Sequence, residues 1–143
     1  MDTTSPFFAC REIFFKTSKF PKLFKAYLLS ANNNHVLLLK QAVYFKPKHI
    51  VINSEEGYLF LKERLKKQAT KVWLGKDALC QLVTEKNIDL VLTAIVGSAG
   101  LIPTISAINA QKTIALANKE TLVVAGGLIM ALAKKKGVSI VPV

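Results

Sequence analysis

Several residue types are scarce in this chain of 143 residues, and each shortage excludes a class of protein. The two cysteines, Cys10 and Cys80, are too few and too far apart for a disulfide framework or a metal motif. His35 and His49 have no partner at metal-ligand spacing, so we expect them at the surface or at a strand end. No apolar run approaches the ~18 residues of a membrane-spanning helix. Because 51% of the residues are hydrophobic, the chain should still fold around a core, as one domain.

Acidic residues are also scarce, with nine against 20 lysines and arginines, which gives a formal net charge of +11. A positive excess of this size attracts nucleic acids, but scattered lysines are more often solvated residues on helix faces. The lysines are not interleaved with aromatic residues, as surfaces that stack bases require. A phosphate-rich cofactor or substrate would use the same positive field. We therefore expect neither a nucleic acid nor a membrane as a partner.

Short apolar runs alternate with helical patterns along most of the chain. Strands are expected at 25–31, 49–52, 71–75, 89–96, 113–117 and 138–143, and helices at 35–45, 55–68, 76–85, 101–110 and 119–137. This alternation predicts an α/β fold, a Rossmann-like doubly wound parallel sheet with helices on both faces. The run 89–96 is almost wholly apolar, which predicts a strand buried on both faces. Gly126 and Gly127 should let the last helix pack closely on a neighbour.

Three strand exits carry polar residues or glycines. They are the asparagines after 25–31, the glycines and serine of 97–100, and the polar residues 118–120. Parallel sheets bind ligands beyond the carboxyl ends of their strands. We therefore expect all three exits to open onto one ligand-binding edge.

The segment IALANKETLVVAGG (114–127) is aliphatic except for Asn118, Lys119, Glu120 and Thr121. Asn118 lies between a strand and a helix, which suits an N-cap, and the helix dipole favours a carboxylate at Glu120. A lysine in that first turn opposes the dipole. Lys119 is better explained if an anion, such as a phosphate, or a polarised carbonyl binds at the same helix end.

A longer segment, AIVGSAGLIPTISAINAQKTIALANKETLVVAGG (94–127), resembles the most distinctive block of the 1-deoxy-D-xylulose 5-phosphate reductoisomerase family. A weaker resemblance runs from KLFKAYLLSANNN through FKPKHIVI to WLGKDAL, so that residues 19–143 are covered. These oxidoreductases use NADPH and a divalent metal, Mg or Mn, to make 2-C-methyl-D-erythritol 4-phosphate in non-mevalonate isoprenoid biosynthesis. The resemblance implies that 19–143 form part of an NADPH-binding domain, after a divergent segment 1–18.

The resemblance also implies roles for particular residues. Asn118 and Glu120 correspond to residues that contact NADPH, and Lys119 corresponds to a lysine that contacts the sugar-phosphate substrate. The turn SANNN corresponds to the loop that meets the adenosine ribose and its 2′-phosphate, which implies cofactor contacts for Asn32, Asn33 and Asn34. Asn33 replaces a lysine that is common in the family, so this position brings no charge to the phosphate.

Two parts of the family pattern are missing. The family begins with a strand and a turn of the form Gly-x-Thr-Gly-Ser-Ile-Gly, whereas this chain reads TTSPFFACREIFF and has no glycine before Gly57. The first βα unit is therefore expected to be missing or altered. In the family, a strand like VSIVPV runs into metal-binding Asp-Ser-Glu, and this chain ends at Val143. We expect no metal ligands, no catalytic residues, no catalytic or C-terminal domain and no activity of these residues alone.

Alternatives to a reductoisomerase fragment remain open. The chain could be a non-functional truncated remnant, or a basic binding module without catalysis, which steeply salt-dependent RNA binding would favour. A different Rossmann-like dehydrogenase is the third alternative, against which the ALANKE segment argues. Full-length family members are homodimers. The expected location is the cytoplasm, with a plastid-type organelle as the alternative.

Overall fold

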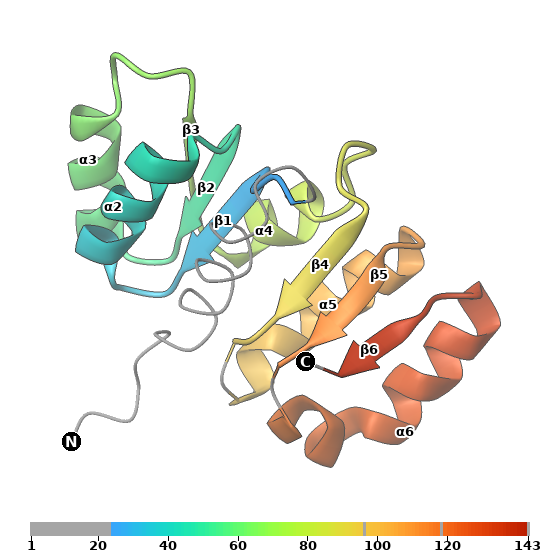
Figure 1. Cartoon of the computed structure of the whole chain (residues 1–143). Helices are drawn as coiled ribbons and strands as arrows, with labels where there is room; N and C mark the ends of the chain where they lie inside the picture. The colour runs from blue at the N-terminus through green and yellow to red at the C-terminus, as the bar shows by residue number, and fades with distance from the viewer. Residues whose placement is uncertain (1–23, 96, 118, 143) are drawn as a thin grey trace. The chain divides into compact units, whose positions relative to one another are not determined.

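The computed structural model describes residues 24–95, 97–117 and 119–142 (Figure 1). The divergent segment 1–18 and Asn118 lie outside these residues. The described residues divide into two compact units, with the division after Leu82. We call residues 24–82 the N-terminal unit and the described residues from Val83 onward the C-terminal unit, and each is considered by itself.

The N-terminal unit is a three-stranded parallel sheet with three helices. Its strands are β1 (Leu28–Ala31), β2 (His49–Ile52) and β3 (Lys71–Leu74), in the order β1-β2-β3. Each strand is followed by a helix, namely α2 (His35–Phe45), α3 (Glu55–Arg64) and α4 (Lys76–Leu82). All four residues of β2 are buried, as expected for the central strand of a parallel sheet.

Two of these helices begin at capped residues. The side-chain oxygen of Asn34 accepts a hydrogen bond of 3.0 Å from the backbone N–H of Leu37. The hydroxyl oxygen of Ser54 accepts one of 3.0 Å from the N–H of Gly57, and serine is among the preferred N-cap residues. These bonds satisfy backbone donors that have no partner within the helix. Helices α2 and α3 therefore both start at the edge of the sheet where β1 and β2 end.

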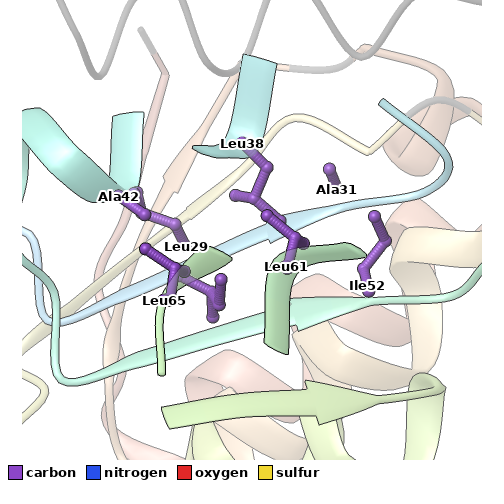
Figure 2. Packing of buried hydrophobic residues seen from close by; sticks show 8 residues of the cluster. Leu29, Ala31, Leu38, Ala42, Ile52, Leu61 and Leu65 are labelled. Carbon is purple, nitrogen blue, oxygen red and sulfur yellow. The ribbon is translucent and has the colours of Figure 1, made fainter. Parts of the chain in front are cut away.

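The core of the N-terminal unit lies between the sheet and helices α2 and α3 (Figure 2). Figure 2 shows side chains from β1, β2 and both helices pointing toward one another. The cluster consists of Leu29, Ala31, Leu38, Ala42, Ile50, Ile52, Leu61 and Leu65. Burying one leucine or isoleucine contributes about 1.5–3 kcal/mol, so this cluster fixes the positions of α2 and α3 on the sheet.

The C-terminal unit repeats the pattern with a second parallel sheet. Its strands are β4 (Leu90–Thr93), β5 (Thr113–Leu116) and β6 (Ile140–Pro142), in the order β4-β5-β6. A 3-10 helix, η1 (Gly97–Gly100), leads directly into α5 (Leu101–Asn109), and α6 (Lys119–Lys136) connects β5 to β6. No helix in the described ranges is long and apolar enough to cross a membrane.

The predicted fold class is confirmed, because parallel strands alternate with helices throughout the described residues. One difference is that these strands form two three-stranded sheets instead of one. Another is that β4 is not buried along its length, since Leu90 is 45% exposed. Strand β4 stands at the end of its sheet order, where a strand has a hydrogen-bonded neighbour on one side only.

The prediction that Gly126 and Gly127 allow close packing is wrong. A Cβ atom built on Gly127 meets nothing within 4 Å, and one built on Gly126 lies 3.7 Å from the Cβ of Leu122, an ordinary contact. The residue before them, Ala125, has non-helical backbone angles of φ −142° and ψ 23°. The two glycines therefore directly follow a kink in α6, and glycine pairs are common at helix kinks.

Candidate cofactor and substrate sites

In the N-terminal unit, asparagines gather at the edge where β1 and β2 end. Asn32, Asn33 and Asn34 follow β1, and Asn53 follows β2. Because parallel strands present their carboxyl ends at the same edge, these loops lie beside each other. We call these four asparagines the amide edge.

Two members of the amide edge are joined twice. The side-chain Nδ2 of Asn53 donates a hydrogen bond of 3.0 Å to Oδ1 of Asn32. The backbone N–H of Asn53 donates another, of 3.1 Å, to the carbonyl oxygen of Asn32. The side-chain bond is exposed, so the amide of Asn32 is both fixed in direction and accessible to a ligand.

The other two asparagines hold the turn against α2. Asn34 is its N-cap, as described above, and Asn33 is exposed. The carbonyl oxygen of Asn33 accepts a bond of 2.8 Å from the backbone N–H of His35, and Nδ1 of His35 lies 3.2 Å from the same oxygen. The His35 ring packs against Phe60 of α3, with 4.8 Å between ring centroids. The turn is thus tied to α2 by backbone bonds and to α3 through the His35 ring.

The chemistry of the amide edge is neutral and rich in hydrogen-bond donors. Neither 31–36 nor 52–57 contains a lysine or arginine, and Glu55 and Glu56 in the first turn of α3 are exposed. Amide N–H₂ groups and the N-terminus of α2 can bind anionic oxygens. The N-terminus of α3 is less suited to an anion, because Glu55 and Glu56 already carry negative charge there. This arrangement can hold a ribose or a phosphate, but it offers no group for bond making.

In the C-terminal unit, the exit of β4 is a tightly packed turn. A Cβ atom on Gly100 would lie 3.1 Å from Cβ of Ile95 and 3.3 Å from its carbonyl oxygen, so a larger residue would not fit without movement. The hydroxyl of Thr104, which is fully buried, donates a bond of 2.7 Å to the carbonyl oxygen of Gly100. These contacts fix the start of α5 close to the end of β4.

The exit of β5 leads directly into α6. The backbone N–H of Ala117 donates a bond of 3.1 Å to the carbonyl oxygen of Thr93, so the chain leaves β5 still paired to β4. Helix α6 starts at Lys119, which places Lys119 and Glu120 in its first turn, as the sequence predicts. Asn118 lies outside the described residues, so its predicted cap is not observed. The predicted contacts of all three residues with cofactor or substrate stay predictions.

Sequence reasoning missed Asn53 and the role of His49. Asn53 directly follows an apolar run, and its position at the exit of a predicted strand could have marked it as a candidate binding residue. His49 is a strand-end residue as predicted, but it is buried, and its Nδ1 accepts a bond of 3.0 Å from Nε1–H of Trp73. The described residues contain no group of three histidine, cysteine, aspartate or glutamate side chains that could hold a metal.

Comparison with known proteins gives one consistent result. Residues 16–126 match the 1-deoxy-D-xylulose 5-phosphate reductoisomerase family. The reductoisomerase of Porphyromonas gingivalis strain ATCC 33277 is 53% identical over 123 residues, and that of Bacteroides thetaiotaomicron is 55% identical over 123 residues. Both matches cover 86% of this chain and 32% of the relative. The chain thus spans about a third of the length of these relatives.

Solved structures agree with these relatives. A reductoisomerase in complex with NADPH, fosmidomycin and magnesium is 32% identical with a TM-score of 0.84, over 98% of this chain and 34% of that one. The Zymomonas mobilis enzyme in complex with NADPH is 33% identical with a TM-score of 0.82, over 98% of this chain and 36% of that one. On this evidence, the chain belongs to the 1-deoxy-D-xylulose 5-phosphate reductoisomerase family.

Proposed function

We propose that this chain provides NADPH-binding structure for the reductoisomerase reaction, in which 1-deoxy-D-xylulose 5-phosphate becomes 2-C-methyl-D-erythritol 4-phosphate. The observation that carries the proposal is the amide edge, which presents hydrogen-bond donors at the carboxyl ends of parallel strands. Two solved structures of this family contain bound NADPH. The reaction reduces its substrate with a hydride, which NADPH supplies when bound.

In the N-terminal unit, Asn32, Asn33 and Asn34 meet the adenosine end of the cofactor. Asn32 and Asn33 are exposed and can donate to the ribose or its 2′-phosphate. Asn34 combines this contact with its cap on α2, whose N-terminus attracts negative charge. The interaction relies on donors and the helix dipole, because the turn has no charged side chain.

In the C-terminal unit, the start of α6 serves the cofactor and the substrate. Asn118 and Glu120 contact NADPH, and Lys119 binds the sugar phosphate. The position of Lys119 in the first turn supports this proposal, because the N-terminus of the helix and the lysine charge then attract the same anion.

The divalent metal of the family does not fit the described residues, which lack a group of three ligands. We propose that these 143 residues alone do not catalyse the reaction. We further propose that the whole enzyme is a homodimer, by family resemblance. A cytoplasmic location is proposed from the bacterial relatives. Analytical ultracentrifugation and cell fractionation test these two points.

The experiment that tests the proposal is a calorimetric titration of the purified chain with NADPH. We expect saturable binding that adenosine 2′,5′-bisphosphate displaces, and circular dichroism must show folded protein. Absence of binding by the folded protein would refute the cofactor role. In a second assay, NADPH oxidation with substrate and manganese should stay at background, and turnover would refute the proposed inactivity.

A further inference from the structure

We propose that Asn53 is a positioning residue that turns the donor side of the Asn32 amide toward the cofactor, and that it thereby favours a 2′-phosphate over a 2′-hydroxyl. This inference rests on the proposed cofactor role and extends it to a residue on a different strand. The two asparagines are 21 residues apart in the chain and meet only because β1 and β2 are parallel neighbours.

The hydrogen bond from Asn53 decides which side of the Asn32 amide faces outward. An asparagine side chain has one oxygen that accepts and one N–H₂ group that donates. Oδ1 of Asn32 is occupied by Nδ2 of Asn53 at 3.0 Å, and the Asn32 side chain is exposed. The N–H₂ group of Asn32 has no bond to any of the residues described, so it is the group available to a ligand.

An N–H₂ donor at Asn32 distinguishes a ribose that carries a 2′-phosphate from one that carries a 2′-hydroxyl. A phosphate group at neutral pH offers only accepting oxygens, whereas a hydroxyl can donate as well as accept. An outward N–H₂ therefore gains a charge-assisted bond with the phosphate, and an outward carbonyl oxygen would repel it. The orientation matters more here because 31–36 and 52–57 contain no basic residue.

Asn53 has a role beyond fastening the loop. The backbone N–H of Asn53 already ties the loops together through its 3.1 Å bond to the carbonyl of Asn32, and that bond does not depend on the side chain. The side-chain bond adds direction to the Asn32 amide. A change at Asn53 should therefore alter the preference between ligands more than it alters the fold.

The test measures the dissociation constants of two probes, adenosine 2′,5′-bisphosphate and 5′-AMP, and their ratio. In Asn53→Asp, the new carboxylate accepts from N–H₂ of Asn32 and leaves its oxygen outward. We expect the preference for the 2′-phosphate to fall at least about tenfold, the range of a bond to a charged group. In Asn53→Ala, the Asn32 amide is free to turn but no charge is added. We expect a smaller fall, of about threefold, in the preference for the 2′-phosphate.

Gln68→Glu is the matched control, because it makes the same change from amide to carboxylate at an exposed residue before β3, away from the strand exits. Its ratio should equal that of the wild type. If Asn53→Asp does not fold, Asn53→Ala carries the test, because it releases the Asn32 amide without adding charge. A wild-type ratio in the folded Asn53→Ala variant would then overturn the positioning role.

The outcomes separate this inference from the proposed function. Failure of the folded wild type to bind either probe would overturn the cofactor role, and this inference with it. Binding by the wild type with an unchanged ratio in Asn53→Asp would overturn the positioning role alone. A fall in Asn53→Asp with a wild-type ratio in Asn53→Ala would also overturn it, because charge would then explain the whole effect.

Discussion

Gly57 lies so close to Ile52 that a methyl group would not fit between them. A Cβ atom built on Gly57 would be 2.6 Å from Cδ1 of Ile52 and 3.1 Å from Cβ of His35. Ile52 is fully buried at the end of β2, so it has little room to move. The missing side chain at Gly57 lets the first turn of α3 rest directly on Ile52 at the end of β2.

Gly57→Ala should therefore destabilise the protein although alanine favours helices. Overpacking costs about 1–3 kcal/mol, and the better helix propensity of alanine returns up to about 1 kcal/mol. We expect a net loss of about 1 kcal/mol in the free energy of unfolding, measured as a lower urea midpoint at an unchanged slope. Gly127→Ala is the control, because a Cβ atom there meets nothing within 4 Å. It should leave stability unchanged or raise it, and equal effects of the two changes would contradict the packing argument.

Trp73→Phe should destabilise the N-terminal unit through His49. Nε1–H of Trp73 donates to Nδ1 of His49, whose side chain is only 3% exposed. Phenylalanine keeps an aromatic ring but removes the donor, and leaving a buried acceptor without that bond costs about 1–3 kcal/mol. Urea unfolding must be followed by circular dichroism, because Trp73 is the single tryptophan of the chain. Leu59→Ala, at a side chain 66% exposed, should change stability by less than about 0.5 kcal/mol.

The sequence predicted some elements to the residue because their ends carry strong local signals. Helix α2 and strand β2 have the predicted bounds, since Asn34 caps the helix and Pro47 separates the two elements. Helix α3 was predicted to reach about residue 68 but ends at Arg64. No glycine or proline lies near this end, so the sequence offered no stop signal there.

The pairing of Asn32 with Asn53 could not be predicted in the same way. Each residue follows its own strand, and nothing in either segment specifies that the two strands are neighbours. Adjacency and register come from the burial of β2 between β1 and β3. The sequence therefore placed Asn32, Asn33 and Asn34 at the end of β1, as observed, but it did not indicate the bond that orients Asn32. The cofactor contacts of these asparagines stay predictions.

Ser54→Ala should lower stability by about 1 kcal/mol, because the hydroxyl oxygen that accepts from the N–H of Gly57 is lost. Ser54→Asp keeps an accepting oxygen and adds negative charge at the N-terminus of α3, where the helix dipole favours it. We expect this second variant to match the wild type in thermal unfolding. Equal losses in both variants would show that the cap does not stabilise α3.

Asn34 combines a structural and a proposed binding role, and two substitutions separate them. Asn34→Ala removes the acceptor for the N–H of Leu37, so it should cost about 1 kcal/mol of stability and weaken NADPH binding. Asn34→Ser keeps an accepting oxygen for the cap but removes the amide, so its stability should stay within a few tenths of a kcal/mol of the wild type. If the amide contacts the cofactor, the serine variant should bind NADPH about threefold to tenfold more weakly, the equivalent of one hydrogen bond. Calorimetric titration of both variants with NADPH measures this difference in affinity. If the stable serine variant binds NADPH with wild-type affinity, Asn34 acts only as the cap of α2. Asn32 and Asn33 would then be the cofactor contacts of this turn.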